Sequence, residues 1–472
     1  MIIIALLAVV GAQEKQESLY SPKGTRTELG LAGFAKILCS AVFVSGRDAN
    51  EAARNSAYFF MPRDEQDKVT FTVNQESKLV RARLGETSRE ARFYGDQGCI
   101  IQQPGKAGVA FKPVPVTTTL PAAATQAWPM GDRDAVATPP AGVDAAKLKA
   151  ATDAAFADPA ALTAGFIVVH KGRIVAERYM DGITKDTQLE SWSMGKSITA
   201  TLFGLLVKDG TYTLEQPAPV ELWHTAPGDP RAKIRNIDLL RMSSGLKFLA
   251  EQDPDYTRDK GYPDHFYIYT GAVNAFDYTI SQPVQFPVNT EGRYRNSDPL
   301  TIGYLIKQAV QKRKQEYLTW PQRALFDKIG IRRQVLETDP FGNFLLTGYD
   351  YGTPRNWARI GMLYLNDGVW QGTRLLPEGW SKFVSTLAPA WKRPVYGAQF
   401  WVNGDGAWNL PKDAYFAAGA GGQNTFIVPS HQLVIVRMGH MRGAGAARAR
   451  TNEALELIMG AVDPAWEVSK PR

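Results

Sequence analysis

The pattern of apolar and polar positions divides the chain into four segments. Residues 1–12 contain a short apolar run, and residues 13–111 mix short helical and strand-like stretches. Residues 112–142 are rich in Pro, Ala and Thr, a composition that favours an extended connector over a helix or a central strand. From residue 143 to residue 472 the helical and strand periodicities become regular, which predicts the main domain there.

Within the main domain, strands are predicted at the two ends and helices between them. Two early strands, 166–169 and 174–179, are joined by a turn that contains Gly172. The predicted helices are 144–156, 193–208, 237–242, 300–312 and 356–366, and the predicted late strands are 397–403, 423–429 and 433–438. Strands at both ends imply one sheet assembled from both ends of the domain and flanked by helices, a mixed α/β (α+β) fold.

The segment 13–111 is predicted to be a small accessory lobe. Its first part, 13–30, is polar and expected to be loose, 33–44 is expected to form a short helix leading into a strand, and 69–73 and 91–94 are predicted strands. Both cysteines, Cys39 and Cys99, lie in this lobe. Pairing them would contribute about 4 kcal/mol in the chain-entropy model. Two separate buried thiols are the alternative that the sequence leaves open.

Composition and charge narrow the class of protein. Hydrophobic residues make up 44% and charged residues 21%, as in a soluble globular protein. The formal net charge is +7, but no run of five like charges occurs, so a diffuse basic surface is expected and no nucleic-acid partner. No CxxC or HExxH pattern occurs and the five histidines are scattered, so we expect no metal site and no cofactor.

The apolar run in residues 1–12 resembles a secretory signal peptide. It is too short to span a bilayer, and Gly11 and Ala12 are small residues of the kind found at a cleavage site. No Lys or Arg precedes the run, unlike a typical signal peptide, and a short buried strand is the alternative. We therefore expect a periplasmic or secreted protein without stable membrane insertion after cleavage.

The segment SWSMGKSITATLFGLL carries the strongest candidate chemistry. It places Ser193 at the start of a predicted helix and Lys196 three residues later, a spacing that puts both side chains on one face. Unpaired N–H groups at a helix start favour a developing oxyanion. A buried lysine with a lowered pKa can remove the proton of a serine hydroxyl, so the pair is a candidate nucleophile and base.

These residues also admit other interpretations. The same spacing recurs at Ser244 and Lys247, but across a glycine turn after a predicted helix. A phosphate-binding loop ending at Ser197 would need Gly at position 190, where Glu190 stands. The nucleophile elbow of α/β-hydrolases remains a rival, with His431 or His440 as the later histidine, although the residues before Ser191 are polar and unlike a strand.

Two further motifs follow in the chain. Tyr294 and Asn296 lie two residues apart before a predicted helix, where a phenol can relay a proton and an amide can contact a substrate carbonyl. Gly421 and Gly422 precede Gln423 and a predicted strand, so the backbone there can approach a ligand closely and present N–H groups. Each motif alone also fits an ordinary turn.

Together and in this order, the three motifs resemble those of the serine β-lactamase and penicillin-binding-protein superfamily. The similarity is greatest to the class C type, the family VIII esterases and the 6-aminohexanoate-dimer hydrolases, and it extends over about residues 145 to 460, through segments such as FIVVHKGRIVAERY and NWARIGMLYLNDGVWQGTRLLPEGW. The resemblance implies a β-lactamase/transpeptidase-like fold, with an antiparallel sheet flanked by helices and a helical subdomain.

The resemblance also implies roles for individual residues. Ser193 would be the acylated nucleophile, and Lys196 with Tyr294 the proton-transfer pair. Asn296 would contact the ester or amide of the substrate. The backbone N–H groups of Ser193 and of Gln423 would form the oxyanion hole.

One position departs from the family pattern. The third motif usually begins with Lys or His, and here Ala420 stands there, so the partner for a β-lactam carboxylate is missing. We therefore expect a serine hydrolase of small esters or short amides. A β-lactamase or a D-amino-acid peptidase on the same site is the second hypothesis, and a catalytically weak cell-wall or ligand-binding module is the third.

Overall fold

The computed structural model describes residues 20–466, and the centre of this part of the chain is a six-stranded antiparallel sheet in the order β12–β13–β14–β15–β5–β6. Its strands are β5 (Thr163–His170), β6 (Arg173–Tyr179), β12 (Trp401–Val402), β13 (Tyr415–Gly419), β14 (Gln423–Val428) and β15 (Leu433–Gly439). The early and late strands meet where β15 pairs with β5, with Leu433 opposite His170. The prediction of one sheet built from both ends of the domain is therefore confirmed.

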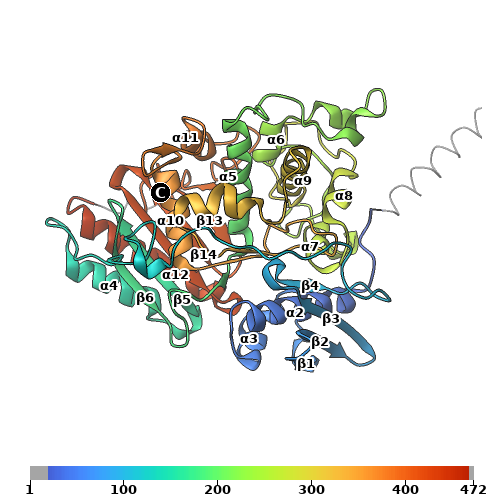
Figure 1. The fold of residues 1–472 in the computed structure, drawn as a ribbon, viewed down its shortest axis with the longest axis horizontal. Helices are drawn as coiled ribbons and strands as arrows, with labels where there is room; N and C mark the ends of the chain where they lie inside the picture. Colours follow the sequence, from blue (N-terminus) through green and yellow to red (C-terminus); the bar gives the residue numbers. More distant parts are fainter. Residues whose placement is uncertain (1–19, 467–472) are drawn as a thin grey trace, which may run out of the picture.

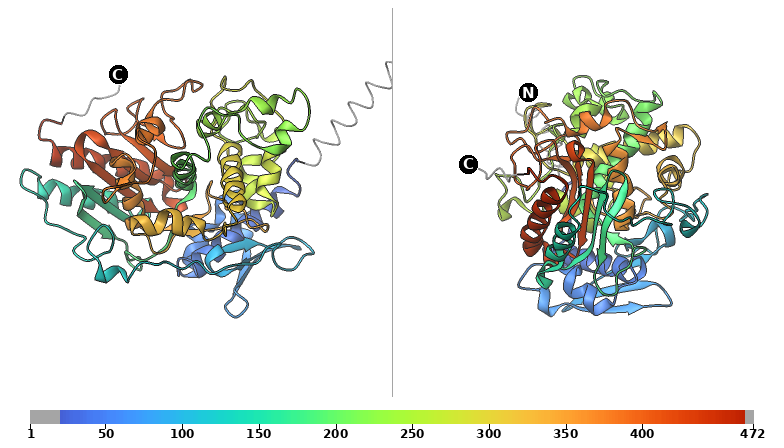
Figure 2. Two further views of the ribbon diagram at one scale, coloured as in Figure 1. Left: turned by 45° about the horizontal axis from the view of Figure 1, so that its top comes forward. Right: turned by 90° about the vertical axis from the view of Figure 1, so that its left-hand side faces the viewer.

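Helices cover both faces of this sheet. α4 (Ala145–Phe156) and α12 (Ala444–Val462) pack together on one face, as Figure 1 and the right-hand view of Figure 2 show. α10 (Pro354–Leu365) packs on the other face, so close that a Cβ on Gly361 would lie 2.4 Å from Val434. Because both faces are covered, every residue of β5 is buried, which explains its continuous apolar sequence.

A helical subdomain lies beside the sheet, with α5 (Gly195–Lys208) between the two (Figure 1). Its helices are α6 (Asn236–Leu240), α7 (Asp264–Thr270), α8 (Ala275–Ile280) and α9 (Ser297–Lys312). α5 packs directly against α9. The domain also contains α11 (Trp380–Ser385). Two small sheets complete it: one in the order β7 (Leu189–Glu190), β9 (Asp350–Gly352), β8 (Val335–Leu336), and a hairpin of β10 (Val369–Trp370) and β11 (Thr373–Arg374).

The N-terminal lobe packs α2 (Arg26–Phe43) against a four-stranded antiparallel sheet, and α3 (Ala49–Asn55) packs against α2. The strands are β1 (Thr70–Asn74), β2 (Leu79–Leu84), β3 (Thr87–Phe93) and β4 (Cys99–Ile101). A disulfide between Cys39 and Cys99 joins α2 to β4, with their Cα atoms 5.9 Å apart. The apolar residues of α2 belong to the same hydrophobic core as α5, so the lobe is packed onto the main domain.

Three local predictions were wrong. The expected loose segment 13–30 overlaps α2, which begins at Arg26 because Thr25 and Glu28 form a capping box, and the segment 33–44 is helical as far as Phe43 and leads into no strand. The predicted strand 397–403 is reduced to Trp401–Val402, since Gly397 lies in a tight turn where its N–H bonds to the Phe400 carbonyl. The segment 1–12, predicted to be a signal peptide, lies outside the described residues.

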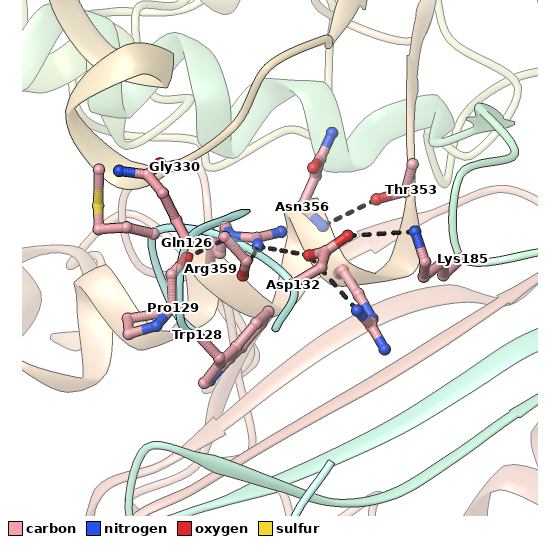
Figure 3. A network of polar contacts seen from close by, with 12 residues as sticks. Gln126, Trp128, Pro129, Asp132, Lys185, Gly330, Thr353, Asn356 and Arg359 are labelled. Carbon is pink, nitrogen blue, oxygen red and sulfur yellow. Dashed lines mark hydrogen bonds and ion pairs between the residues drawn. The ribbon is translucent and has the colours of Figure 1, made fainter. Parts of the chain in front are cut away.

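The connector 112–142 runs over the surface of the main domain and is anchored by a polar network (Figure 3). The Asp132 carboxylate accepts hydrogen bonds from Arg359 at 2.8 Å and from Lys185 at 3.3 Å. The Arg359 guanidinium also donates to the carbonyls of Pro129 and Gly131, both at 2.7 Å. These contacts tie the connector to α10, so the lobe and the main domain are joined by more than a flexible tether.

Candidate active site

Ser193 lies in a tight turn between the small sheet and α5. The turn is a 3₁₀ segment, Trp192–Met194, and α5 begins at Gly195, two residues later than the predicted helix start. The residue before the turn is fixed twice: the Ser191 N–H bonds to the Asp350 carbonyl at 2.9 Å, and the Trp357 indole donates to the Ser191 hydroxyl at 2.9 Å. The turn therefore presents Ser193 from a rigid base.

Lys196 lies against Ser193 as its spacing predicts. The Lys196 Nζ atom is 2.8 Å from the Ser193 Oγ atom and donates to the Thr347 carbonyl at 2.6 Å. The residue is 1% exposed. Burial lowers the pKa of the Lys196 amine well below its usual value, although the charge of Asp350 acts in the opposite direction. An uncharged amine with a free lone pair can accept the proton of Ser193.

Tyr294 faces the same amine from the loop that precedes α9. The Lys196 Nζ atom lies 4.9 Å from the centre of the Tyr294 ring. Burial raises the pKa of the Tyr294 phenol above its usual value, although hydrogen bonding with Ser193 and Trp401 acts in the opposite direction. The phenol therefore keeps its proton near neutral pH and is suited to donate it.

Asn296 is placed behind this group, fully buried at the N-cap of α9. Its side-chain amide donates to the His265 carbonyl at 2.9 Å, and its Oδ1 atom has no hydrogen-bond partner among the described residues. That oxygen is a buried acceptor that remains to contact another group. Contact of Asn296 with a substrate stays a prediction.

The third motif forms the hairpin between β13 and β14. Gly421 and Gly422 have φ angles of 84° and 75°, which favour glycine, and their carbonyls accept hydrogen bonds from Arg437 at 2.7 and 3.1 Å. The side chain of Gln423 makes two hydrogen bonds with the backbone of Gly439: its nitrogen donates to the carbonyl and its oxygen accepts from the N–H. These contacts hold the hairpin in one shape.

The part of the hairpin nearest to the nucleophile is Gly419, which pairs with Gln423 across it. A Cβ atom on Gly419 would lie 2.2 Å from the Ser191 carbonyl and 3.1 Å from the Ser193 nitrogen. The glycine is therefore required for this approach, and the backbone of the hairpin lies beside the Ser193 nitrogen.

Asp350 is a residue of this site that the sequence did not indicate. Its carboxylate is fully buried, receives a hydrogen bond from Gln334 at 3.1 Å, and leaves Oδ1 without a hydrogen-bond partner in the described part of the chain. Burial raises the pKa of Asp350 to about 7, although Ser191, Gln334 and Lys196 act to lower it. An aspartate in the segment GYDYG carries no motif, so only the fold reveals it.

The rival interpretations of the sequence are not assembled in the structure. The Ser244 hydroxyl donates to Asp298 at 3.0 Å, so this serine is committed to a structural contact. His431 contacts Ser430 and Asp463. His440 lies 3.7 Å from Glu190, so neither histidine provides the base of a nucleophile elbow. In residues 20–466, no group of three or more His, Cys, Asp or Glu side chains is arranged to hold a metal ion.

The antiparallel sheet is covered by helices, and a serine in contact with a buried lysine lies at the start of the helix beside it. This arrangement is that of a serine hydrolase. A family model described as Beta-lactamase matches residues 148–458. The chain therefore belongs to the beta-lactamase family, and the expected resemblance and fold are confirmed.

Individual relatives are distant. The 6-aminohexanoate-dimer hydrolase of Paenarthrobacter ureafaciens is 22% identical over 297 residues, which cover 58% of this chain and 72% of that protein. A penicillin-binding protein homologue from Caulobacter crescentus has a TM-score of 0.52 and 15% identity, covering 69% of this chain and 99% of its own. The D-amino acid amidase of Ochrobactrum anthropi SV3 has a TM-score of 0.50 and 17% identity, covering 67% of this chain and 99% of its own. Such structural likeness supports the fold alone.

Proposed function

We propose that the protein cleaves carboxylic esters or short amides through an acyl-enzyme on Ser193. The observation that carries this proposal is the 2.8 Å contact between Ser193 Oγ and the buried amine of Lys196. A hydroxyl at that distance from an uncharged amine can lose its proton as it attacks a carbonyl carbon. Lys196 is then the base, and Tyr294, whose raised pKa keeps it protonated, is the acid.

The reaction proceeds in two balanced halves. Ser193 Oγ adds to the substrate carbonyl while its proton passes to Lys196, and the tetrahedral intermediate collapses as Tyr294 protonates the departing alcohol or amine. The proton on Lys196 then returns to the Tyr294 oxygen. Water attacks the acyl-enzyme with loss of a proton to the same pair, and Ser193 leaves with its proton restored.

The developing oxyanion needs hydrogen-bond donors. We propose the N–H of Ser193 and an N–H of the Gly419–Gln423 hairpin, with Gln423 as the donor that the family resemblance implies. The approach of Gly419 to the Ser193 nitrogen supports the involvement of this hairpin. Each donor of this kind contributes about 3 kcal/mol to the stabilisation of a transition state.

The substrate class follows from what stands beside the nucleophile. Ala420 offers no charge or hydrogen bond where β-lactam-active relatives carry Lys or His, so a carboxylate at that point of the substrate is not recognised. The name of one relative, a 6-aminohexanoate-dimer hydrolase, supports hydrolysis, and that of a structural neighbour, a D-amino acid amidase, supports amides as substrates beside esters.

A panel of p-nitrophenyl esters, short amides and one β-lactam tests this proposal. We expect turnover of esters or amides by the wild type, and none by Ser193→Ala or Lys196→Ala. Lys247→Ala is the matched control, because it removes the lysine of the second Ser-x-x-Lys segment. Activity retained in Ser193→Ala, or a β-lactam as the best substrate, would overturn the proposal.

We propose further that the protein is exported to the periplasm or secreted. The Cys39–Cys99 disulfide supports this location, because structural disulfides persist in oxidising compartments. Cell fractionation with sequencing of the mature N-terminus tests it: cleavage after residue 12 is expected, and an intact cytoplasmic chain with free thiols would contradict it.

A further inference from the structure

Aromatic rings of the N-terminal lobe reach the nucleophile turn. Phe59 and Phe60 stand in the 3₁₀ segment Ala57–Phe60, which follows α3. The Phe59 ring centre lies 4.8 Å from that of Trp192 and 5.7 Å from that of Phe266, and the Phe60 ring lies 6.0 and 5.4 Å from the same two. Phe60 and Trp192 are buried, whereas Phe59 and Phe266 are partly exposed.

The two partly exposed rings adjoin the reacting groups. Trp192, on which Phe59 packs, directly precedes Ser193. Phe266 follows His265, whose ring lies 6.0 Å from the Tyr294 ring. Ring contacts therefore link Tyr294 to Phe59 through the buried His265 and through Phe266. Burial lowers the pKa of His265 well below its usual value, with Lys196 and Arg295 acting in the same direction, so these rings carry no imidazolium charge near neutral pH.

Buried polar contacts fix the position of the lobe relative to the nucleophile turn. Glu190, three residues before Ser193, accepts hydrogen bonds from the Ser56 hydroxyl at 2.6 Å and from Arg47 at 3.3 Å. Both partners belong to the lobe, and the Arg47 and Glu190 side chains are each 3% exposed. Since Ser56 immediately precedes the segment that carries Phe59, this buried contact sets the distance between Phe59 and the nucleophile turn.

The two sides of the site differ in what they can hold. On one side of Tyr294 lies Trp401, with ring centres 5.0 Å apart. The leaving group must reach the Tyr294 phenol to be protonated, and we assign it to the Trp401 side because the Trp401 ring packs more closely on Tyr294 than the His265 ring does, at 5.0 Å against 6.0 Å. The acyl group stays on Ser193 and is left with the side formed by Trp192, Phe59 and Phe266.

We infer that the N-terminal lobe completes the substrate site, and that Phe59 with Phe266 binds an uncharged aromatic or branched apolar acyl group. This inference rests on the proposed function. The family match begins at residue 148, so the lobe lies outside the matched domain. Because Phe59 of the lobe packs beside the nucleophile turn, the lobe is placed to select the acyl group.

Two series of esters separate the two sides. The first varies the acyl group (acetyl, isobutyryl, phenylacetyl) with p-nitrophenol as the constant leaving group, and the second varies the leaving alcohol of phenylacetate esters. In Phe59→Ala, we expect the kcat/KM ratio of phenylacetyl to acetyl to fall by about tenfold or more. The ratios within the second series should stay unchanged.

Two further variants make the result decisive. Phe71→Ala is the matched control, because its ring packs on Phe34 within the same lobe, and its acyl preference should equal that of the wild type. Phe59→Trp should shift preference towards acetyl by narrowing the site, which tests the inference even if Phe59→Ala fails to fold. An unchanged acyl preference in folded Phe59 variants, or a change that follows the leaving group, overturns the inference alone. No turnover of either series by the wild type overturns the proposed function with it.

Discussion

Replacing Gly195 with alanine should damage the site from within, although alanine is the better helix former. Gly195 has a φ of −55°, so an alanine there is not strained by the backbone, and by propensity alone it would stabilise the helix by about 1 kcal/mol. Its Cβ would, however, lie 2.4 Å from the Leu346 carbonyl and 2.5 Å from Asp350 Oδ1. Neither is the far end of a flexible chain: one is backbone, and the other is a fully buried carboxylate.

We expect this overpacking to lower the free energy of unfolding by about 1–3 kcal/mol. A displacement of α5 by about 1 Å would also move Lys196 from Ser193 and lower kcat by about 100-fold. Urea unfolding and ester turnover measure the two effects. Gly445→Ala on α12 is the control, since its Cβ would meet nothing within 4 Å, and it should be neutral or stabilising. Equal stability and activity in the two variants would refute the assigned contacts.

Three other substitutions test parts of the account. Asp350→Asn removes a charge that raises the pKa of Lys196. Because the base must be uncharged to act, the acid limb of the pH profile of kcat/KM should move to lower pH, and a shift to higher pH contradicts this role of Asp350. Arg47→Ala should lower the free energy of unfolding by about 3–5 kcal/mol, because it leaves the buried Glu190 without its guanidinium, and adding Glu190→Gln should recover part of the loss. Burial alone would raise the pKa of Glu190, but Arg47 and its other partners lower it from 4.5 to about 2. The contribution of ionised Glu190 to the free energy of unfolding is therefore complete above pH 4.5 and is lost as the pH falls to 2. Acid titration of unfolding checks this window, and an Arg47→Ala variant with the same window as the wild type speaks against it. Cys39→Ser should cost about 4 kcal/mol for the loop of 60 residues, and reductant should lower the stability of the wild type only.

The sequence predicted the parts of the fold that depend on local pattern. The hairpin of β5 and β6 around Gly172, the helical period of α10 and the Ser193–Lys196 spacing are set by residues close together in the chain, and the structure has them within a few residues of the predicted bounds. The predicted strand 397–403 was too long, because the chain turns at Gly397 and only Trp401 and Val402 pair with β13.

What the sequence could not supply were contacts between distant segments. Asp350 reaches the start of α5 from more than 150 residues away, and no local pattern marks it. The junction of Arg47 with Glu190 joins two segments whose pairing depends on how the lobe docks. The pairing of Cys39 with Cys99 does not follow from the sequence for the same reason, since it depends on where α2 lies against β4.

The central claim is that Ser193 is a nucleophile activated by Lys196. Labelling of the purified protein with a fluorophosphonate, followed by mass-spectrometric mapping, tests it most directly, with the wild type beside Lys196→Ala. We expect one label on Ser193 in the wild type, strongly reduced labelling in the variant, and none on Ser244. A label on another serine, or no label in the folded wild type, would contradict it.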